Sequence, residues 1–407
     1  MDPDELLARQ LQEEEMQQQQ QQQQQQRSNS NQQQQQQQQQ QRDFLGRLHS
    51  GLETMMKFED QLARAMALSV VPIEELEKRT RERGLKAQVT SGGGGFGAFG
   101  KKPEKKDNED DETSEKNRTE EGGTGEGKSL SFKDAFIVEL LKWFKEEFFS
   151  WCDKPECCVE MCTFSKINDK TTTTNKTVRT NPANMQCVGM GYPNGEERSF
   201  GASMVELYAC TGCGCQTRFP RYNEAVKLLE TRTGRCGEFA NCFSLICRAL
   251  DYETRYVLDW TDHVWTEIWS PSQNRWIHCD SCEAAFDEPR LYSEGWGKSL
   301  SFVVAFSVDG VADVSKRYQK MDDAMLGRRR AIVHDEAFVS EAIARCSDVL
   351  ETGMDVARRE LVRKRNEEEQ EELRMLDMSE EEKKNLPGRT TGSLEWRKAR
   401  GELGDQK

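Results

Sequence analysis

Two spacings of apolar residues divide the middle of the chain into predicted helices and strands. Apolar residues recur at helical spacing over residues 134–149 and 235–250, which predicts two amphipathic helices. Alternation of apolar and polar residues predicts strands over residues 252–258, 263–269, 275–279 and 303–307. A Ser-Pro-Ser-Gln-Asn sequence separates the second and third strands and is typical of a turn, so we expect these two strands to form a hairpin.

The flanking regions have a simpler pattern. Residues 4–15 and 58–77 have apolar residues at helical spacing, and the second stretch is interrupted at Pro72. Two glutamine runs follow the first stretch and predict a disordered or loosely helical region. The pattern predicts a glutamine-rich region over 1–57, a helical arm over 58–90, a Gly-rich and charged linker over 91–128, a core over 129–335 and a charged helical tail over 336–407.

The net charge and the composition argue against several classes of protein. The 407 residues carry a formal net charge of −14, which argues against a nucleic-acid binder because such proteins need a basic surface. No stretch approaches the ~20 apolar residues of a membrane span, and the opening MDPDELLARQ lacks the features of a secretory signal. We therefore expect a cytoplasmic protein, and in that reducing compartment cysteine clusters indicate metal binding or catalysis.

Cys236 is the first candidate for catalysis. Two glycines, Gly234 and Gly237, lie close to it in the sequence TGRCGEF, and the predicted helix follows at once. The thiol therefore lies at a helix N-terminus, where the helix dipole and free backbone N–H groups favour a thiolate. The same N–H groups could stabilise an oxyanion.

A thiol nucleophile needs a base, and the chain has four histidines. Two of them, His263 and His278, lie in predicted strands of the core and are rival candidates. Asp280 follows His278 on the next alternate position, and the predicted hairpin brings this carboxylate toward His263. In that position Asp280 would orient the imidazole and stabilise its cation.

A second group of cysteines has the spacing of a metal site. Cys210 and Cys213 form a CxxC pair, and Cys157, Cys158 and Cys162 lie upstream. Two sulfurs from the upstream group would complete a closed site of four thiolates, the usual coordination of structural zinc. Cys215 is a possible further ligand. Such an ion would hold a loop-rich lobe together and would take no part in the chemistry.

These motifs resemble those of the peptide:N-glycanase family within the transglutaminase-like superfamily. The matching sequences are LLKWFKEEFFSW (140–151), TRFPRYN (217–223), GRCGEFANCF (234–243), DHVWTE (262–267), RWIHCDSCE (275–283) and LYSEGWGK (291–298). The resemblance covers about residues 130–335. It implies an α+β, papain-like (transglutaminase-like) cysteine hydrolase core with a zinc-stapled lobe, flanked by disordered and helical tails.

The resemblance also implies roles for individual residues. Cys236 is implied as the nucleophile, His263 as the general base and then acid, and Asp280 as the group that orients it; His263 is thus favoured over His278. Glu283 is implied as a contact of the chitobiose part of a glycan, with Glu267 and Trp151 as weaker candidates. The implied zinc ligands are Cys157, Cys162, Cys210 and Cys213. The family's first CxxC pair would end at Glu160, so Cys158 is an alternative to Cys162.

The function implied by this family is the removal of N-linked glycans from misfolded glycoproteins in the cytoplasm, with conversion of asparagine to aspartate, as part of ER-associated degradation. Ubiquitin-shuttle proteins and the proteasome are the implied partners. A transglutaminase or a cysteine protease could use the same three catalytic groups. A different class of function is a non-catalytic zinc-binding adaptor in the ubiquitin–proteasome pathway.

Overall fold

The computed structural model describes residues 3–91, 130–158, 184–376 and 386–404. Its largest sheet has six strands in the order β11-β10-β6-β7-β8-β9, and every neighbouring pair is antiparallel. The strands are β6 (Thr254–Asp259), β7 (Val264–Ser270), β8 (Arg275–Asp280), β9 (Ala285–Phe286), β10 (Val303–Ser307) and β11 (Gly310–Asp313). The predicted hairpin is confirmed, because β7 pairs with β8 with Glu267 opposite His278.

A smaller lobe contains an antiparallel sheet in the order β2-β3-β4. Its strands are β2 (Met185–Gly191), β3 (Val205–Cys210) and β4 (Gln216–Pro220), with the short helix α5 (Gly195–Ser199) between β2 and β3. Two further strands, β1 (Ser150–Trp151) and β5 (Thr233–Gly234), form a parallel pair in which Trp151 lies opposite Gly234. This pair joins the segment leading to the small lobe to the residues just before Cys236.

Helix α7 (Cys236–Ala249) is the buried helix of the core. It contacts β6 and β7, and α2 (Gln61–Val70) and α6 (Ala225–Thr231) pack on it. Side chains on all sides of α7 are buried, as expected for a helix between a sheet and other helices. The predicted helix over 235–250 is therefore confirmed within one residue of each end.

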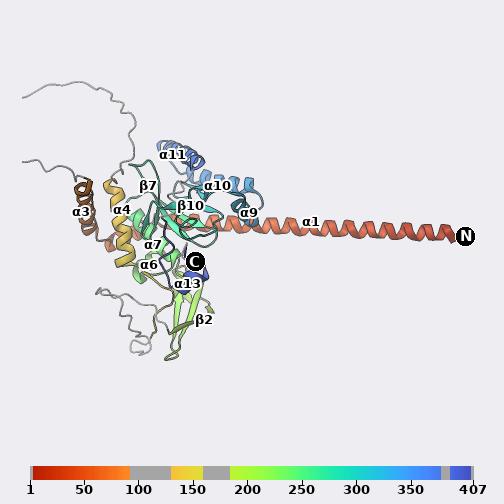
Figure 1. Cartoon of the computed structure of the whole chain (residues 1–407), viewed down its shortest axis with the longest axis horizontal. Coiled ribbons are helices and arrows are strands. Elements are labelled where there is room, and N and C mark those ends of the chain that lie inside the picture. Colours follow the sequence, from red (N-terminus) through yellow and green to blue (C-terminus); the bar gives the residue numbers. More distant parts are fainter. Residues whose placement is uncertain (1–2, 92–129, 159–183, 377–385, 405–407) are drawn as a thin grey trace, which may run out of the picture. The chain divides into compact units, whose positions relative to one another are not determined.

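Helices later in the chain cover other parts of the six-stranded sheet. α10 (Glu336–Glu351) packs against β11, and the short helix α8 (Ser315–Tyr318) contacts both β10 and α11 (Val356–Met375). Figure 1 shows α9 (Asp323–Ile332), α10 and α11 grouped near β10. The last described helix is α13 (Leu394–Ala399), within a segment that reappears at the site below.

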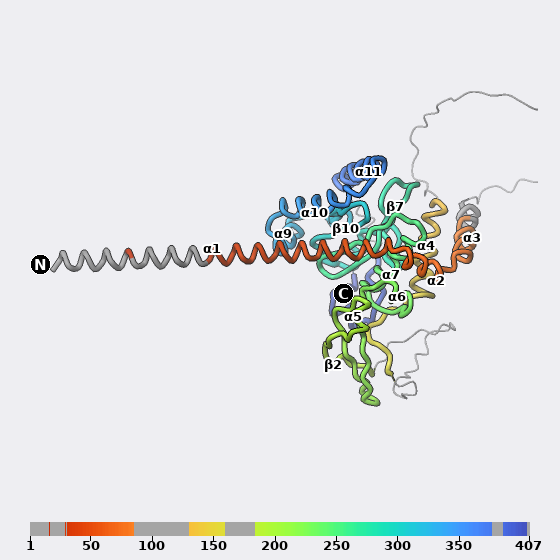
Figure 2. Tube along the Cα trace, turned by 180° about the vertical axis from the view of Figure 1, so that it is seen from behind, coloured from red at the N-terminus to blue at the C-terminus, as the bar shows by residue number. Residues whose placement is uncertain are grey.

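The N-terminal glutamine runs lie within one helix, α1 (Pro3–Lys57), consistent with the good helix propensity of glutamine. The last turns of α1 contact β6, β10 and α10, as can be followed in Figure 2. Gly51 has no side chain there, and a Cβ would lie 2.5 Å from the ring of Phe306, so the close approach of α1 to β10 requires glycine. None of the described helices combines the length and apolarity needed to cross a bilayer.

The described residues 72–91 and 130–140 belong to a separate compact unit. It contains α3 (Ile73–Ser91) and most of α4 (Phe132–Trp143), and it follows the interruption predicted at Pro72. The helix predicted over 134–149 exists, but its last turn, Phe144–Phe148, is a π-helix. Most of the predicted linker lies outside the described residues, and the predicted domain boundaries stay predictions.

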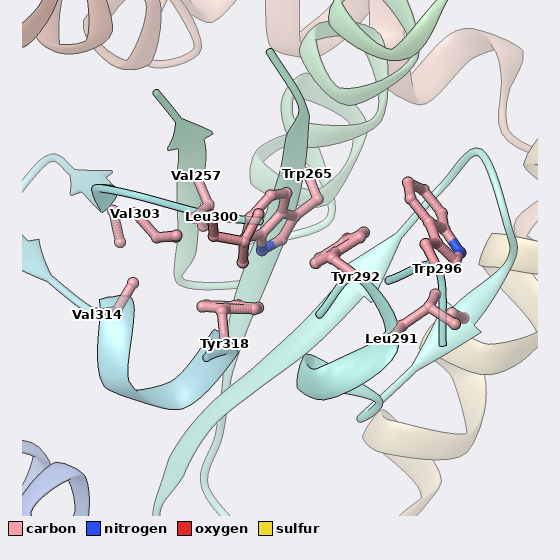
Figure 3. Close-up of a cluster of buried hydrophobic side chains, with 11 residues drawn as sticks. Val257, Trp265, Leu291, Tyr292, Trp296, Leu300, Val303, Val314 and Tyr318 are labelled. Carbon is pink, nitrogen blue, oxygen red and sulfur yellow. The ribbon is translucent and has the colours of Figure 1, made fainter. Parts of the chain in front are cut away.

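One side of the six-stranded sheet holds a dense aromatic cluster. The indole of Trp265 lies 4.4 Å from the ring of Tyr292 and 4.6 Å from that of Tyr318, measured between centroids. Figure 3 shows these rings together with the aliphatic side chains of Val257 and Leu300. The cluster fixes β7 against the loops that follow β9 and β11, and His263 lies at its edge, 4.9 Å from the ring of Tyr292.

Candidate active site

Cys236 is the first residue of α7, as the sequence predicts. The preceding residue, Arg235, has an extended backbone, and its N–H donates to Oε2 of Glu238 at 2.9 Å. A Cβ on Gly234 would lie 2.3 Å from Cβ of Glu238, so this tight entry into the helix requires glycine. The partly exposed thiol is therefore held at the helix N-terminus.

A network of ion pairs ties this helix start to the small lobe. Arg235 pairs with Glu206 at 2.7 Å, and Arg221 pairs with Glu238 at 2.6 Å and with Glu206 at 3.1 Å. Burial would raise the pKa of Glu206, but hydrogen bonds from Arg235 and Tyr208 lower it below its ordinary value. Arg221 lies in the TRFPRYN motif, whose sequence does not reveal this role; only the fold brings Arg221 to Glu238.

His263 lies just before β7 and is buried. Its Nε2 lies 2.9 Å from Oδ2 of Asp280, which confirms that the hairpin brings these two residues together. Within the described residues, Nδ1 bonds no nitrogen or oxygen, and it is the nitrogen left for the Cys236 thiol. The backbone carbonyl of Asp262, the neighbour of His263, is 3.8 Å from the Cys236 sulfur.

Asp280 ends β8, and both of its oxygens are used. Oδ1 accepts hydrogen bonds from the backbone N–H groups of Cys282 at 2.7 Å and Glu283 at 3.2 Å. Oδ2 accepts from His263 and from the hydroxyl of Tyr292, each at 2.9 Å. Burial acts to raise the pKa of Asp280, but these hydrogen bonds and the neighbouring histidines hold it well below its ordinary value. The carboxylate is therefore ionised and fixed in direction.

The rival base, His278, has a different environment. Its Nε2 lies 2.7 Å from the Tyr292 hydroxyl, and its Nδ1 accepts from the backbone N–H of Glu288 at 3.3 Å. Burial lowers the pKa of His278 to about 4, so the imidazole is neutral near pH 7. With both nitrogens engaged, His278 supports Asp280 through Tyr292 and has no free nitrogen to act as a base.

Cys236 and His263 influence each other's protonation. Burial would raise the pKa of Cys236, but a hydrogen bond with His263 and the charges of His263 and Arg389 hold it below its ordinary value. Burial acts to lower the pKa of His263, but Asp280 and Cys236 raise it above its ordinary value. Both shifts favour a thiolate–imidazolium pair, which is an activated nucleophile with its acid in place.

Two of the three residues predicted to bind substrate lie near this pair. The carboxylate of Glu283, three residues after Asp280, accepts hydrogen bonds from the backbone N–H groups of Thr390 and Thr391, both at 3.0 Å. Trp151 lies opposite Gly234 and donates from Nε1 to Asp153 at 2.7 Å.

The third residue, Glu267, is not brought to the site. Its carboxylate has no exposed surface and bonds Arg317 at 2.9 Å and the Tyr318 hydroxyl at 2.6 Å. The Glu267 side chain lies on the face of the sheet that carries the aromatic cluster. There α8 and α11 cover it.

The described residues contain one group of three cysteine sulfurs that could hold a metal ion. The sulfurs of Cys157, Cys210 and Cys213 lie within 4.8 Å of one another, and two of them are 3.4 Å apart. These separations are close to the roughly 3.8 Å between thiolates around a tetrahedral zinc ion. Cys158 is paired with Cys215 as a disulfide beside this group. The predicted fourth ligand, Cys162, lies outside the described residues.

Two models of known protein families match the part of the chain that contains this site. The family model of the transglutaminase-like superfamily matches residues 193–281, which include Cys236, His263 and Asp280. The model of the Rad4 transglutaminase-like domain matches residues 259–375. These matches confirm the predicted transglutaminase-like core.

Curated relatives named peptide-N(4)-(N-acetyl-beta-glucosaminyl)asparagine amidase are similar over most of the chain. The protein of Yarrowia lipolytica is 40% identical over 71% of this chain and 74% of its own length. That of Saccharomyces cerevisiae is 38% identical over 69% and 74%. That of Macaca fascicularis is 36% identical over 89% and 47%, so the chain spans about half the length of this relative.

Proposed function

Because the chain belongs to the peptide-N(4)-(N-acetyl-beta-glucosaminyl)asparagine amidase family, we propose that it hydrolyses the bond between an asparagine side chain and an N-linked glycan. The observation that carries the proposal is the Cys236 thiol at the start of α7 beside His263, which Asp280 holds at 2.9 Å. A thiolate, an acid–base group and an orienting carboxylate are what amide hydrolysis through a thioester requires.

In the first step, the Cys236 thiolate attacks the side-chain amide carbon of the glycosylated asparagine. The oxygen of that amide becomes an oxyanion, and backbone N–H groups at the start of α7 are the donors available to it. The His263 imidazolium gives its proton to the departing nitrogen, the carbon–nitrogen bond breaks, and the glycan leaves as a glycosylamine. Asp280 stabilises the imidazolium before the proton transfer and fixes the orientation of the ring.

In the second step, neutral His263 takes a proton from water while the water oxygen attacks the thioester carbon. The carbon–sulfur bond breaks, Cys236 is released as the thiolate, and the imidazolium is restored. The peptide is left with aspartate in place of asparagine. The free glycosylamine then reacts with water, loses ammonia and becomes a reducing sugar.

Glu283 and Trp151 are the proposed neighbours of the two N-acetylglucosamine units next to the peptide. The Trp151 indole offers an apolar face of the kind on which sugar rings pack. Both oxygens of Glu283 already accept hydrogen bonds from Thr390 and Thr391. Glu283 therefore shapes this surface by holding residues 390 and 391 in place. Glu267, buried in its ion pairs, takes no part in the proposed contact.

The proposed setting is the cytoplasm, with misfolded N-glycoproteins of the secretory pathway as substrates and with ubiquitin-shuttle proteins and the proteasome as partners. The family likeness supports this proposal. A denatured glycoprotein is the appropriate first substrate, because an asparagine side chain must reach Cys236 in an extended peptide.

We further propose that the cysteine group holds one structural zinc ion through Cys157, Cys210, Cys213 and a fourth sulfur from Cys162; Cys158 or Cys215 is an alternative only when the disulfide between them is reduced. When bound, the ion cross-links the β2-β3-β4 lobe and supplies no step of the reaction. We expect metal analysis to give one zinc per chain, and Cys210→Ser to lose the ion and lower the melting temperature. Cys346→Ser on α10 is the matched control and should retain the ion.

The test of the function is incubation with a denatured high-mannose glycoprotein, followed by mass spectrometry of peptide and glycan. We expect free glycan and aspartate at the former glycosylation site, and neither product from Cys236→Ala. An isopeptide bond would identify a transglutaminase and a cut chain would identify a protease. An unchanged glycoprotein, with the protein folded and loaded with zinc, would contradict the proposal and favour the adaptor function.

A further inference from the structure

Residues 386–404, here called the 386–404 segment, lie against both sides of the site. On one side, Thr390 and Thr391 bind the carboxylate of Glu283 through their backbone N–H groups at 3.0 Å and also through their hydroxyls. Figure 3 shows Trp296 near Leu291 and Tyr292. The loop that contains these residues packs closely against the segment. A Cβ on Gly295 would lie 2.5 Å from the carbonyl oxygen of Pro387.

On the other side, the segment is attached next to the strand that precedes the small lobe. The backbone N–H of Ser393 donates to Oδ2 of Asp153 at 2.6 Å. The indole of Trp396 packs edge-on against that of Trp151, with centroids 5.3 Å apart. The 386–404 segment therefore bridges Glu283 and Trp151, two of the three residues that were predicted from sequence to bind substrate.

Arg389 is the residue that the segment buries between these attachments. Its side chain has no exposed surface. The guanidinium carbon lies 4.5–5.1 Å from the centroids of three indole rings, those of Trp396, Trp296 and Trp151. Figure 1 shows α13, which follows Arg389 in the segment, next to the lobe that contains β2.

The guanidinium is only partly satisfied. Nη1 donates to Glu402 at 2.8 Å, and Nε is 4.0 Å from Glu283. In the part of the chain that the structure describes, neither Nε nor Nη2 has a hydrogen-bond acceptor. Glu402 is shared with Arg400 at 3.1 Å, and the Glu283 oxygens are taken by Thr390 and Thr391. A buried cation with unfilled donors is costly unless an anion or acceptor lies nearby.

The anion that fits is the thiolate of Cys236. Trp296 contacts both Arg389, at 4.6 Å, and the ring of His263, at 5.1 Å, so Arg389 and the catalytic histidine pack against the same indole. The charge of Arg389 is among the causes that lower the pKa of Cys236, after burial and His263. Conversely, Cys236 contributes to raising the pKa of Arg389.

We propose that Arg389 is a positioning residue that holds Cys236 as the thiolate, and that the 386–404 segment is therefore part of the active site. This inference rests on the proposed function for its biological meaning, but the state of the thiol can be measured without any glycoprotein. Arg389 acts in addition to His263: the imidazole exchanges protons during the reaction, whereas the guanidinium keeps its charge throughout.

Several other titratable and charged groups surround Cys236, and a change in its ionisation must be judged against them. From α7 itself the group is Glu238, which is paired with Arg221. From β6 it is Tyr256, from the loop after β8 it is Cys282, and just before β7 they are His263 and Asp262. Apart from His263, the cations that act on Cys236 are Arg221, whose guanidinium pairs with Glu238 and Glu206, and Arg389, whose Nε and Nη2 have no acceptor among the described residues.

The experiment measures the rate at which iodoacetamide alkylates Cys236 between pH 5 and pH 9, following the Cys236 peptide by mass spectrometry. We expect Arg389→Met to raise the midpoint of this profile by about one pH unit, which corresponds to about tenfold slower alkylation below the midpoint. Arg389→Lys retains the charge and should restore most of the shift. Lys398→Met removes an exposed charge from the same segment and should leave the profile unchanged.

An unshifted midpoint in folded Arg389→Met would overturn the inference. If Arg389→Met does not fold, Arg389→Lys and Arg389→Gln differ by one charge at similar length, and equal midpoints for that pair would overturn it as well. The proposed function fails in a different way: the wild type would then release no glycan while the alkylation midpoint still depends on residue 389.

Discussion

A catalytic residue lies just before strand β7, and a structural one lies in the middle of that strand. His263 lies beside Cys236 and bonds Asp280 on β8. Glu267 lies four residues later on the same face, where Arg317 and Tyr318 of α8 bind its carboxylate. Both residues are buried polar groups four positions apart, yet His263 faces a nucleophile and Glu267 faces cations that it must neutralise. The alternation of a strand determines which face a residue occupies; the element that covers that face determines its role.

The largest expected effect comes from a substitution at Asp280, the residue that bonds His263. Asp280→Asn keeps the size of the side chain but removes the charge that stabilises the His263 imidazolium. By analogy with other catalytic triads, we expect the rate of glycan release to fall by about 10⁴-fold. The melting temperature should fall far less than the rate. A variant that keeps more than a tenth of the activity would mean that His263 works without this carboxylate.

The second-largest effect is expected from a substitution at Glu267 in β7. Glu267→Gln leaves Arg317 and Arg255 with less compensation in a buried network that Glu369 of α11 completes at 2.8 Å and 2.7 Å. Removing one partner of a buried ion pair costs about 3–5 kcal/mol, and we expect the free energy of unfolding in urea to fall by that order. The folded fraction should keep its rate of glycan release. A rate loss without a stability loss would place Glu267 in the reaction.

The third effect compares the two buried histidines. The pKa of His278 is about 4 in the folded protein and near 6.5 when unfolded, so the unfolded chain binds the extra proton first. This group therefore contributes stability that is present above pH 6.5 and lost as the pH falls toward 4, about 2 kcal/mol between pH 7 and pH 5. His263 has the opposite sign, because its pKa is raised in the fold.

Urea unfolding at pH 7 and pH 5 measures this difference. His278→Gln should lower the stability at pH 7 but make it less dependent on pH over that interval. His263→Gln provides the control, since removing a histidine whose pKa is raised should make the loss toward pH 5 steeper. Parallel pH dependences in both variants would contradict the assignment of a neutral His278.

The smallest effect concerns the link between the two histidines. Tyr292→Phe removes one hydrogen bond to Oδ2 of Asp280 and leaves the bond from His263 in place. A hydrogen bond to a charged group contributes about 1.5–3 kcal/mol. We expect a loss of about tenfold in the rate and a shift of its acid limb to higher pH, because the carboxylate becomes easier to protonate. An unchanged pH profile would mean that Tyr292 only packs against the ring.

Local pattern predicted much of this arrangement. The helix beginning at Cys236 and the hairpin that joins His263 to Asp280 follow from apolar spacing and one turn sequence. The family resemblance also placed Glu267 near the site, and the strand pattern could not correct this, because alternation gives the face of a strand without giving the partner layer. The covering helices α8 and α11 come from later in the chain, and nothing in β7 specifies them.

The contribution of residues 386–404 was also beyond local pattern. The Leu-Pro-Gly-Arg sequence at 386–389 has no helical or strand periodicity, and its charge suggested only an exposed tail. Arg389 becomes buried because Trp151 and Trp296 from earlier in the chain surround it together with Trp396 of its own segment. The cysteine group was found by its spacing, but which sulfur is the fourth ligand depends on loop geometry that spacing does not fix.

The position of the 386–404 segment has a consequence for how the protein matures during translation. Cys236, His263 and Asp280 leave the ribosome well before Arg389, and at about 5–20 residues per second the interval is roughly 5 to 20 seconds. During that time the nascent core can already fold around its three catalytic residues while Glu283 still lacks Thr390 and Thr391. If Arg389 has the proposed role, the thiol is then less acidic than in the finished protein, and a newly made chain becomes fully reactive only after its later part has docked.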